Sequence, residues 1–321
     1  MSDARWMAAA VALGWRGRGR TAPNPNVGCL IVKEGRVVGR GWTQPGGRPH
    51  AEAMALAEAG DEAQGATVYA SLEPCAHESA RGPACADLLV AARPARVVIA
   101  CGDPDPRIDG RGIARIEAAG IAVTQGICTE AAEASMAGFL TRIRLGRPFV
   151  TLKLALSIDG RIALASGESR WLTGAEARAD AHAERARADM ILVGRGTYEA
   201  DSPSLDVRLP GLAVRSPMRA LLTGGDAPEG WARIAEPGAI HALDGINDLM
   251  VEGGARTAAA FVAADLVDRL LIYRAPILIG GGKAGLADID LDSLAAAHGR
   301  WRRIATRPLG SDLREDYVRS R

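Results

Sequence analysis

Two short segments of this 321-residue chain hold three side chains of the kinds that can bind zinc, with one carboxylate close to them in sequence. His50-Ala51-Glu52 supplies an imidazole and a carboxyl group, and Pro74-Cys75-Ala76-His77 followed by Cys85 supplies two thiols. A catalytic zinc site has three protein ligands and keeps its fourth position open to water. We therefore predict that His50, Cys75 and Cys85 bind Zn²⁺.

Glu52 is the group in this set that could carry protons. Zinc lowers the pKa of a bound water to about 7, so hydroxide is present at neutral pH. In zinc-dependent base deaminases, a glutamate that is not a ligand transfers the protons. We predict that Glu52 takes a proton from the water, passes it to a ring nitrogen and later protonates the departing ammonia. The alternative is a closed structural site with His77 as fourth ligand, in which Glu52 would have no role.

Two predicted helices must begin at the ligands. Residues 50–59 are alanine-rich and are followed by Gly60, which is typical of a helix that ends at a glycine. Residues two apart do not share a helix face, so His50 and Glu52 can reach one ion only from the first turn. A strand over 67–72 precedes the cysteine segment, and Pro83 favours a helix that begins near Cys85. The N-terminus of that helix would stabilise thiolates.

The remainder of the first 146 residues alternates between helical and strand patterns. We expect helices near 3–15, 111–119 and 129–144, and strands at 27–33, 36–39 and 96–100 with one more short strand. This order predicts a sheet covered by helices on both faces, which is a three-layer α/β/α domain. Gly146-Arg147-Pro148 marks the expected boundary, so the domains would be residues 1–146 and 147–321.

The patterns begin again after this boundary. Strands are predicted at 149–156, 190–193, 218–223, 249–252 and 269–279, and helices near 175–188 and 255–264. Glycines gather at the strand ends, as in Gly194-Arg195-Gly196, Gly253-Gly254 and Gly280-Gly281-Gly282, where backbone N–H groups could bind a phosphate. The same glycines could simply form turns. No Gly-x-Gly-x-x-Gly fingerprint opens a strand-turn-helix unit, which argues against an ordinary Rossmann domain.

Composition argues against several other classes of protein. The chain has 39 Lys and Arg against 38 Asp and Glu, and this net charge of +1 lacks the basic footprint of nucleic-acid binding. No apolar run reaches the length of a membrane helix, and the N-terminus lacks a signal-peptide pattern, so we expect a cytoplasmic protein without membrane partners. Cys29, Cys101 and Cys128 are expected to be reduced and mostly buried.

Six motifs, taken in order, make the whole chain resemble the bifunctional deaminase/reductase family of riboflavin biosynthesis. They are PNPNVG at 23–28, HAE at 50–52, EPCAH at 73–77, KLALSIDG at 153–160, SGESRW at 166–171 and VEGG at 251–254. The resemblance implies a cytidine-deaminase-like domain followed by an α/β domain folded like dihydrofolate reductase. The first would hydrolyse the 2-amino group of a diaminopyrimidinone ribosylamino phosphate. The second would reduce C1′ of the sugar with NADPH to give the ribitylaminouracil phosphate.

The resemblance also implies binding residues and a homo-oligomer, either a dimer or a tetramer. Asn24 would contact the deaminase substrate through its amide, which can donate and accept hydrogen bonds. The NADPH contacts would come from Ala155, Trp171, Thr197, Asp201 and Gly254, and the contacts to the reductase substrate from Ser169, Arg185, Leu205, Arg208 and Glu252. Arginine suits a phosphate because its planar fork matches phosphate geometry. Arg185 could instead be a charge on a helix surface.

The chain departs from the family pattern at several points. Nine residues separate Cys75 from Cys85 where the family more often has eight, so Cys85 is assigned by allowing one inserted residue. The same insertion leaves open whether Arg81 matches a basic, phosphate-contacting residue. Asp105 stands where the family usually has asparagine, which leaves its substrate contact open. The segment 210–248 is shorter than usual, and no cofactor contacts are assigned there.

Two rival functions remain at the level of sequence. A deaminase that acts on a polynucleotide usually has a tight Cys-x-x-Cys, whereas this chain has a long loop between its cysteines and a second domain. A zinc-stabilised binding protein whose catalysis has lapsed would keep the ligands without using Glu52.

Overall fold

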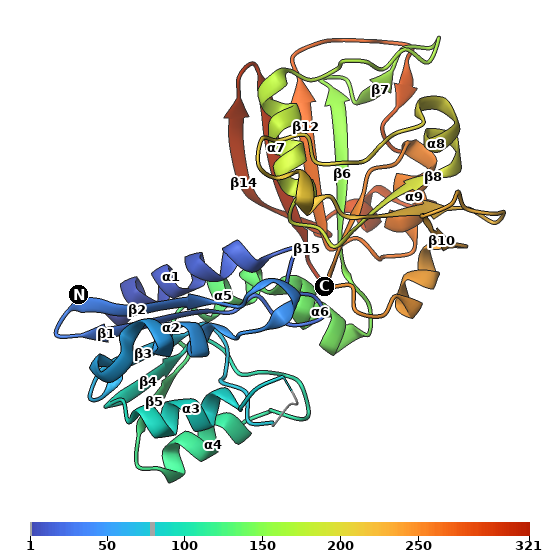
Figure 1. Cartoon of the computed structure of the whole chain (residues 1–321). Helices are drawn as coiled ribbons and strands as arrows, with labels where there is room; N and C mark the ends of the chain where they lie inside the picture. Colours follow the sequence, from blue (N-terminus) through green and yellow to red (C-terminus); the bar gives the residue numbers. More distant parts are fainter. Residues whose placement is uncertain (1, 78–80) are drawn as a thin grey trace. The chain divides into compact units, whose positions relative to one another are not determined.

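The computed structural model describes residues 2–77 and 81–321. The chain divides into two compact units, Met1–Gly146 and Arg147–Arg321, each with its own sheet and core (Figure 1). The first unit ends at Gly146, which has a φ of 66° and caps the preceding helix in the left-handed conformation that glycine adopts readily. No helix of the described residues is long and apolar enough to cross a membrane.

The first unit has a five-stranded sheet in the order β2-β1-β3-β4-β5. Its strands are β1 (Gly28–Lys33), β2 (Arg36–Trp42), β3 (Thr67–Ala70), β4 (Arg96–Ile99) and β5 (Ala122–Gln125). β1 is antiparallel to both of its neighbours, and β3, β4 and β5 are parallel. The helices are α1 (Asp3–Gly14), α2 (Ala51–Ala59), α3 (Cys85–Ala92), α4 (Arg111–Ala118), α5 (Thr129–Ser135) and α6 (Ala137–Leu145).

Two glycines show that helices cover both faces of this sheet. A Cβ at Gly28 would lie 1.9 Å from the carbonyl oxygen of Ala10 in α1, and a Cβ at Gly41 would lie 1.9 Å from that of Ala51 in α2. Gly41 pairs with Cys29, the neighbour of Gly28, and successive strand residues face opposite sides. α1 and α2 therefore pack on opposite faces, and the predicted three-layer α/β/α fold is confirmed.

The second unit has an eight-stranded sheet in the order β10-β9-β8-β11-β6-β12-β15-β14. Its strands are β6 (Phe149–Ser157), β8 (Met190–Gly194), β9 (Met218–Leu222), β10 (Ala232–Ile234), β11 (Asp248–Val251), β12 (Arg269–Ala275), β14 (Trp301–Leu309) and β15 (Asp312–Arg319). All pairs from β10 to β12 are parallel, and β15 is antiparallel to β12 and to β14. β7 (Arg161–Ala163) and β13 (Lys283–Ala284) form a separate two-stranded sheet.

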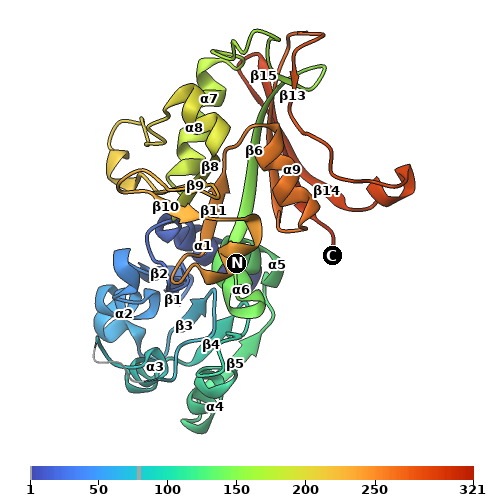
Figure 2. The same cartoon turned by 90° about the vertical axis from the view of Figure 1, so that its right-hand side faces the viewer.

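Helices lie on both faces of the larger sheet (Figure 2). α7 (Ala175–Arg185) contributes Ala177 to one core, and α9 (Ala255–Ala263) contributes Phe261 to the other. Successive residues of β8 face these two cores in turn: Ile191 belongs to the same core as Ala177, and Leu192 to the same core as Phe261. The predicted α/β architecture of the second half is thus confirmed.

Several expected elements differ in the structure. The single helix expected near 129–144 is wrong, because the chain turns at Met136, whose fully buried side chain separates α5 from α6. The strand expected to reach 279 ends at Ala275, and the helix expected to reach 188 ends at Arg185. β14 was not expected because nearly all of it is exposed, so no alternation of apolar and polar residues marks it.

Candidate active sites

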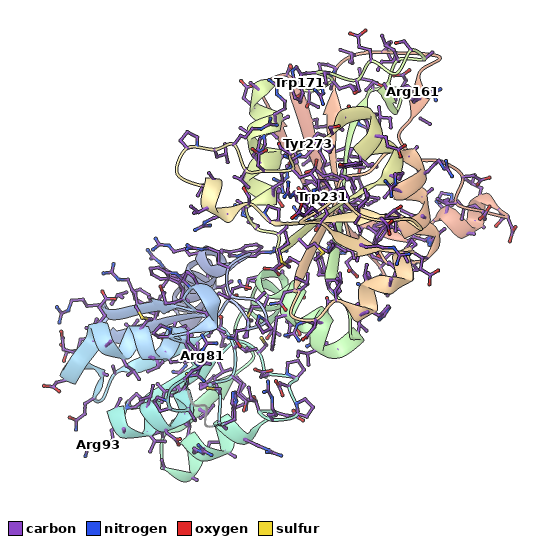
Figure 3. All side chains as sticks on the ribbon, turned by 45° about the vertical axis from the view of Figure 1, so that its right-hand side comes forward. Arg81, Arg93, Arg161, Trp171, Trp231 and Tyr273 are labelled. Carbon is purple, nitrogen blue, oxygen red and sulfur yellow. The ribbon has the colours of Figure 1, made fainter. Side chains whose placement is uncertain are left out.

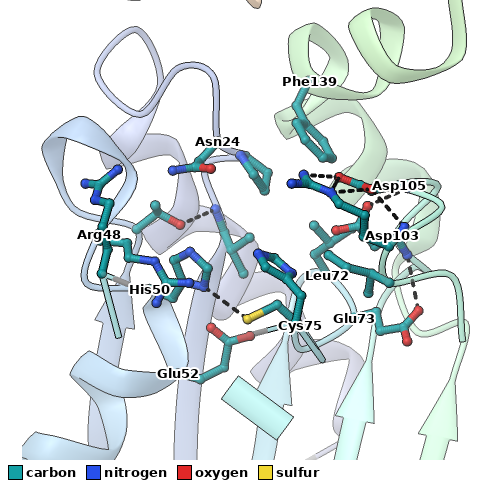
Figure 4. Close-up of a pocket in the computed structure, with 17 residues that line it drawn as sticks. Asn24, Arg48, His50, Glu52, Leu72, Glu73, Cys75, Asp103, Asp105 and Phe139 are labelled. Carbon is teal, nitrogen blue, oxygen red and sulfur yellow. Dashed lines mark hydrogen bonds and ion pairs between the residues drawn. The ribbon is translucent and has the colours of Figure 1, made fainter. Parts of the chain in front are cut away.

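His50, Cys75 and Cys85 come together beyond the ends of strands in the first unit. Figure 4 shows two of them, His50 and Cys75, with Glu52 close by. His50 Nδ1 lies 3.3 Å from Cys85 Sγ and 3.5 Å from Cys75 Sγ, and all three ligand atoms lie within 4.8 Å of one another. Zinc bonds of about 2.0 Å to nitrogen and 2.3 Å to sulfur, at a tetrahedral angle, place those atoms about 3.5 Å apart. The three side chains therefore fit zinc. Within residues 2–77 and 81–321, no other group of three such ligands lies this close.

The local structure explains how distant residues meet here. His50 is the extended N-cap of α2 and Glu52 lies in the first turn of that helix, as the argument from helix faces requires. Cys85 is the first residue of α3, and its backbone N–H donates to Cys75 Sγ over 3.3 Å. A hydrogen bond between the two thiol groups lowers the pKa of Cys75, and the same thiol–thiol bond together with burial raises the pKa of Cys85. A cation bound between the two sulfurs would replace that shared proton.

Glu52 is buried beside the ligands, with 3% of its surface exposed. Burial raises the pKa of its carboxyl group above the usual value, and the charge of His50 opposes that rise. A carboxyl group whose pKa is raised toward neutral can both accept and release a proton during one turnover. His77 lines the same pocket, but its ring does not belong to the cluster of possible metal ligands. Among the described residues, that cluster has three members, which leaves the fourth coordination position of a tetrahedral zinc to water.

The pocket around these residues combines an apolar wall with polar and cationic groups (Figure 4). Its further lining residues are the apolar Val27, Leu72, Ile108 and Phe139, the polar Asn24, Asp103 and Asp105, and the cationic Arg48, Arg81 and Arg107. Apolar surface with a few directed polar groups suits a flat heterocycle, and guanidinium groups suit a phosphate.

The pKa values of two aspartates in the pocket shift in opposite directions. Burial raises the pKa of Asp103 to about 6, whereas hydrogen bonds from Arg107 lower the pKa of Asp105. Arg107 holds Asp105 through its backbone N–H and its guanidinium group. Sequence reasoning did not single out Arg48, Arg107 or Phe139. Of these three, only Arg48 could have been found from the sequence. It stands two residues before His50, so it must lie close to that predicted metal ligand.

In the second unit, Arg185 and Glu252 form a buried ion pair. Arg185 Nε donates to Glu252 Oε1 over 2.6 Å and Nη2 donates to Oε2 over 2.8 Å, while Lys153 Nζ lies 3.6 Å from Oε2. Burial raises the pKa of Glu252, but Lys153 and Arg185 outweigh it and hold the pKa at about 2. With 14% of its side chain exposed, Arg185 is not a surface charge of the helix.

The loop before Arg208 lies against this pair. Arg185 Nη1 donates to the carbonyl oxygen of Asp206 over 3.1 Å, and Arg208 Nε lies 3.4 Å from His182 Nε2. Leu205 is buried with a φ of 55°. Four of the five predicted substrate residues, Arg185, Leu205, Arg208 and Glu252, thus gather around one loop. The fifth, Ser169, lies on the loop between β7 and α7.

Predicted cofactor residues lie at the carboxyl ends of parallel strands. α8 (Arg195–Asp201) begins directly after β8, and α9 begins a few residues after the neighbouring strand β11. The N–H of Gly254 donates to Thr197 Oγ1 over 3.1 Å, which joins the two helix starts. A Cβ at Gly253 would lie 2.5 Å from Thr257 Cβ, so this close approach requires glycine. Backbone N–H groups at adjoining strand ends fit the phosphates of a dinucleotide.

The other three cofactor candidates come from separate elements. Ala155 lies in β6 and Asp201 is the last residue of α8. Trp171 lies on the loop between β7 and α7 and is 63% exposed (Figure 3). The guanidinium of Arg178 lies 4.9 Å from its ring centroid, a cation–π contact that orients the ring.

Comparisons with known proteins give the same division into two parts. Residues 1–101 match the family described as "Cytidine and deoxycytidylate deaminase zinc-binding region". Residues 148–227 and 239–313 match the family described as "RibD C-terminal domain".

Relatives span nearly the whole chain. The riboflavin biosynthesis protein RibD of Escherichia coli is 40% identical over 92% of this chain and 94% of its own, and that of Mycobacterium tuberculosis H37Rv is 39% identical over 96% and 94%. Among solved structures, Acinetobacter baumannii RibD has a TM-score of 0.90 at 36% identity, covering 99% of both chains. A diaminohydroxyphosphoribosylaminopyrimidine deaminase/5-amino-6-(5-phosphoribosylamino)uracil reductase from Thermotoga maritima has a TM-score of 0.88 at 28% identity, covering 99% of this chain and 98% of its own.

The resemblance expected from the six motifs is confirmed, because both parts of the chain match in order and the identities hold from end to end. This chain belongs to the RibD family of bifunctional deaminase/reductase enzymes of riboflavin biosynthesis.

Proposed function

We propose that the chain catalyses two successive reactions on one pyrimidine phosphate. Residues 1–146 deaminate 2,5-diamino-6-(5-phosphoribosylamino)pyrimidin-4(3H)-one with the help of zinc. Residues 147–321 then reduce the ribosyl group with NADPH to give 5-amino-6-(5-phosphoribitylamino)uracil. The observation that carries this proposal is that His50, Cys75 and Cys85 meet at a pocket whose lining includes His50, Cys75 and the buried Glu52.

In the deaminase unit, zinc bound by His50, Cys75 and Cys85 would supply activated water at neutral pH. A carboxylate oxygen of Glu52 takes a proton from the attacking water and delivers it to a ring nitrogen of the substrate. The same carboxylate then takes the second proton from the hydroxyl group that the attack has placed on the ring carbon, and passes it to the amino group. The C–N bond breaks, ammonia leaves and a C=O bond remains at that carbon; the raised pKa of Glu52 favours its protonated form between these transfers. Asn24 orients the ring through its amide, and Phe139 and Leu72 exclude bulk water.

In the reductase unit, NADPH would supply the hydride that reaches C1′ of the sugar. Gly254 and Thr197 bind the cofactor at the two joined helix starts, with Ala155, Trp171 and Asp201 as further cofactor contacts. Arg208, whose side chain is 56% exposed, binds the substrate phosphate, and Ser169 and Leu205 are further substrate contacts. Glu252, held in place by Arg185, accepts hydrogen bonds from the substrate.

The experiment that tests the deaminase proposal replaces Glu52 with glutamine. Glu52→Gln should retain zinc and lose roughly 10²–10⁴-fold in kcat for ammonia release, because general acid–base catalysis contributes that much. Glu62→Gln is the matched control, since Glu62 belongs to the same unit, does not line the pocket and forms an exposed ion pair with Arg36. Deamination at the wild-type rate by the zinc-loaded Glu52→Gln variant would rule out the proton transfer proposed here.

We further propose that the enzyme works in the cytoplasm as a homo-oligomer, a dimer or a tetramer, and does not bind nucleic acid. The balanced charge of +1 supports the last point. Light scattering of the purified chain and a binding titration with single-stranded DNA test these statements; a monomer, or binding of that DNA at physiological salt, would contradict them.

A further inference from the structure

Glu73 is a buried carboxylate between two segments that border the deaminase pocket (Figure 4). It follows β3 and precedes the ligand Cys75 by two residues. Its Oε1 accepts hydrogen bonds from the backbone N–H groups of Gly112 over 2.9 Å and Ile113 over 3.2 Å. Its Oε2 accepts from the N–H groups of Gly110 over 3.0 Å and Asp103 over 3.4 Å. One side chain thus binds four backbone amides of the segment 103–113.

Two further contacts join the same segments. The backbone N–H of Glu73 donates over 3.0 Å to the carbonyl oxygen of Cys101, which lies two residues before the segment. A Cβ at Gly112 would lie 1.9 Å from the carbonyl oxygen of Pro74, so the start of α4 packs directly on the ligand loop. The position of the segment is therefore defined relative to Cys75.

The segment 103–113 forms one wall of the pocket. Asp103, Asp105, Arg107 and Ile108 all line it, and Ile108 also packs against Cys75 and Cys85. Within the segment, the backbone N–H of Asp105 donates to Asp103 Oδ1 over 2.9 Å, so the side chain of Asp103 is held against the backbone at Asp105. Whatever holds the segment in place also sets the distance from these polar groups to the metal ligands and Glu52.

We propose that Glu73 is a positioning residue of the deaminase, whose carboxylate fixes the substrate-facing wall at 103–113 relative to the zinc ligands. This inference rests on the proposed deaminase function. Glu73 does not touch the substrate; it acts through Asp103, Asp105 and Ile108. Its loss leaves the ligands and Glu52 unaltered, so substrate binding suffers more than the chemical step.

Glu73→Gln is the sharpest perturbation, because glutamine keeps the shape but replaces one acceptor oxygen by an N–H₂ donor. That donor would face two backbone N–H groups and could accept from neither. Buried donors left without acceptors are costly, so the segment should leave its position. Glu73→Asp keeps both acceptors on a side chain shorter by one methylene, and its effect should lie between glutamine and wild type.

The test combines zinc content, deamination kinetics and amide hydrogen exchange on the full-length chain. Glu73→Gln should bind one zinc, raise KM by roughly tenfold or more and leave kcat within about threefold, consistent with the loss of two or more hydrogen bonds to a charged group. Amides of the segment 103–113 should exchange faster, while those of β3 and β4 remain protected. Asp3→Asn is the matched control, since Asp3 accepts from Tyr69 and Arg96 of the same unit away from the pocket.

The outcomes separate the possibilities. Loss of zinc, a fall in kcat at unchanged KM, or unchanged exchange at 103–113 would each overturn the proposal. A response equal to that of Asp3→Asn would show a role in stability alone and would overturn it too. If Glu73→Gln does not fold, Glu73→Asp decides by the same criteria. A wild-type chain that releases no ammonia would instead refute the deaminase function. Hydrogen exchange would still show whether Glu73 holds the segment 103–113 in place.

Discussion

The buried pair of Arg185 and Glu252 gives a prediction whose size follows from the structure. Its two parallel hydrogen bonds of 2.6 and 2.8 Å join side chains that are 14% and 9% exposed. Removal of one member of such a pair leaves the other charged and buried, which costs about 3–5 kcal/mol. We therefore expect Arg185→Met and Glu252→Gln each to destabilise the second unit by that amount, and the double variant to cost about 3 kcal/mol less than the two single costs together.

The pKa of Glu252 gives an independent magnitude. A native pKa of about 2 against the usual 4.5 corresponds to roughly 3 kcal/mol of stability at neutral pH. A carboxyl group with a lowered native pKa stabilises the fold above its unfolded pKa, and that stability is lost as the pH falls toward the native pKa. About 2 kcal/mol of the contribution should therefore vanish between pH 6 and pH 3, and only in chains that retain Glu252.

The assay is urea unfolding with hydrogen exchange read from peptides of α7 and β11, so that the second unit is followed by itself. The difference in unfolding free energy between wild type and Glu252→Gln should shrink as the pH falls from 6 to 3. Other carboxylates contribute equally to both proteins and cancel. A coupling below about 1 kcal/mol in the double-mutant cycle, or a difference that does not change with pH, would refute this reasoning.

Three further predictions concern the metal and the fold. Cys85→Ser should lose zinc in metal analysis whereas His77→Ala should keep one equivalent; stoichiometric zinc in Cys85→Ser would mean that the ligand assignment is wrong. Chelation of zinc should stop ammonia release but spare NADPH oxidation with substrate that is already deaminated, and loss of both activities would contradict separate sites. Asp268 is buried and binds Arg147 over 2.7 and 2.9 Å and the N–H of Val150 over 2.8 Å, so Asp268→Asn should destabilise the second unit by about 3–5 kcal/mol in urea unfolding. A cost under about 1 kcal/mol would show that this network is not required.

The grouping of His50, Cys75 and Cys85 could be predicted from sequence because local signals mark the helix starts at which His50 and Cys85 lie. Gly60 marks the end of α2, and the spacing of His50 and Glu52 places both in its first turn. Pro83 marks the start of α3. In the structure, His50 is the N-cap of α2 and Cys85 is the first residue of α3, as these signals predict. The same holds for the glycine pair after β11, where the close approach of Gly253 to Thr257 requires glycine.

Other parts of the site depend on contacts between residues that are distant in sequence. Nothing in the sequence around Glu73 indicates that its partners are backbone amides from Gly110 to Ile113, because any acidic residue would look the same there. The hydrogen-bonded pair of Asp105 and Arg107 could not be predicted either, because two residues of a loop contact each other only in its folded conformation. β14 was missed because nearly all of its residues are exposed, so the strand shows no apolar–polar alternation. The break at Met136 was missed because it depends on the burial of that side chain in the core, which the periodic pattern does not indicate.

Mass spectrometry of the products formed from the diaminopyrimidinone substrate, with and without NADPH, tests the two-step proposal most directly. Without NADPH, the zinc-loaded chain should give only the deaminated ribosylamino product, in which an amino group is replaced by oxygen. With NADPH, that product should gain two hydrogens. Reduction without prior deamination would contradict the proposed order of steps, and an unchanged substrate mass in both reactions would contradict the function itself.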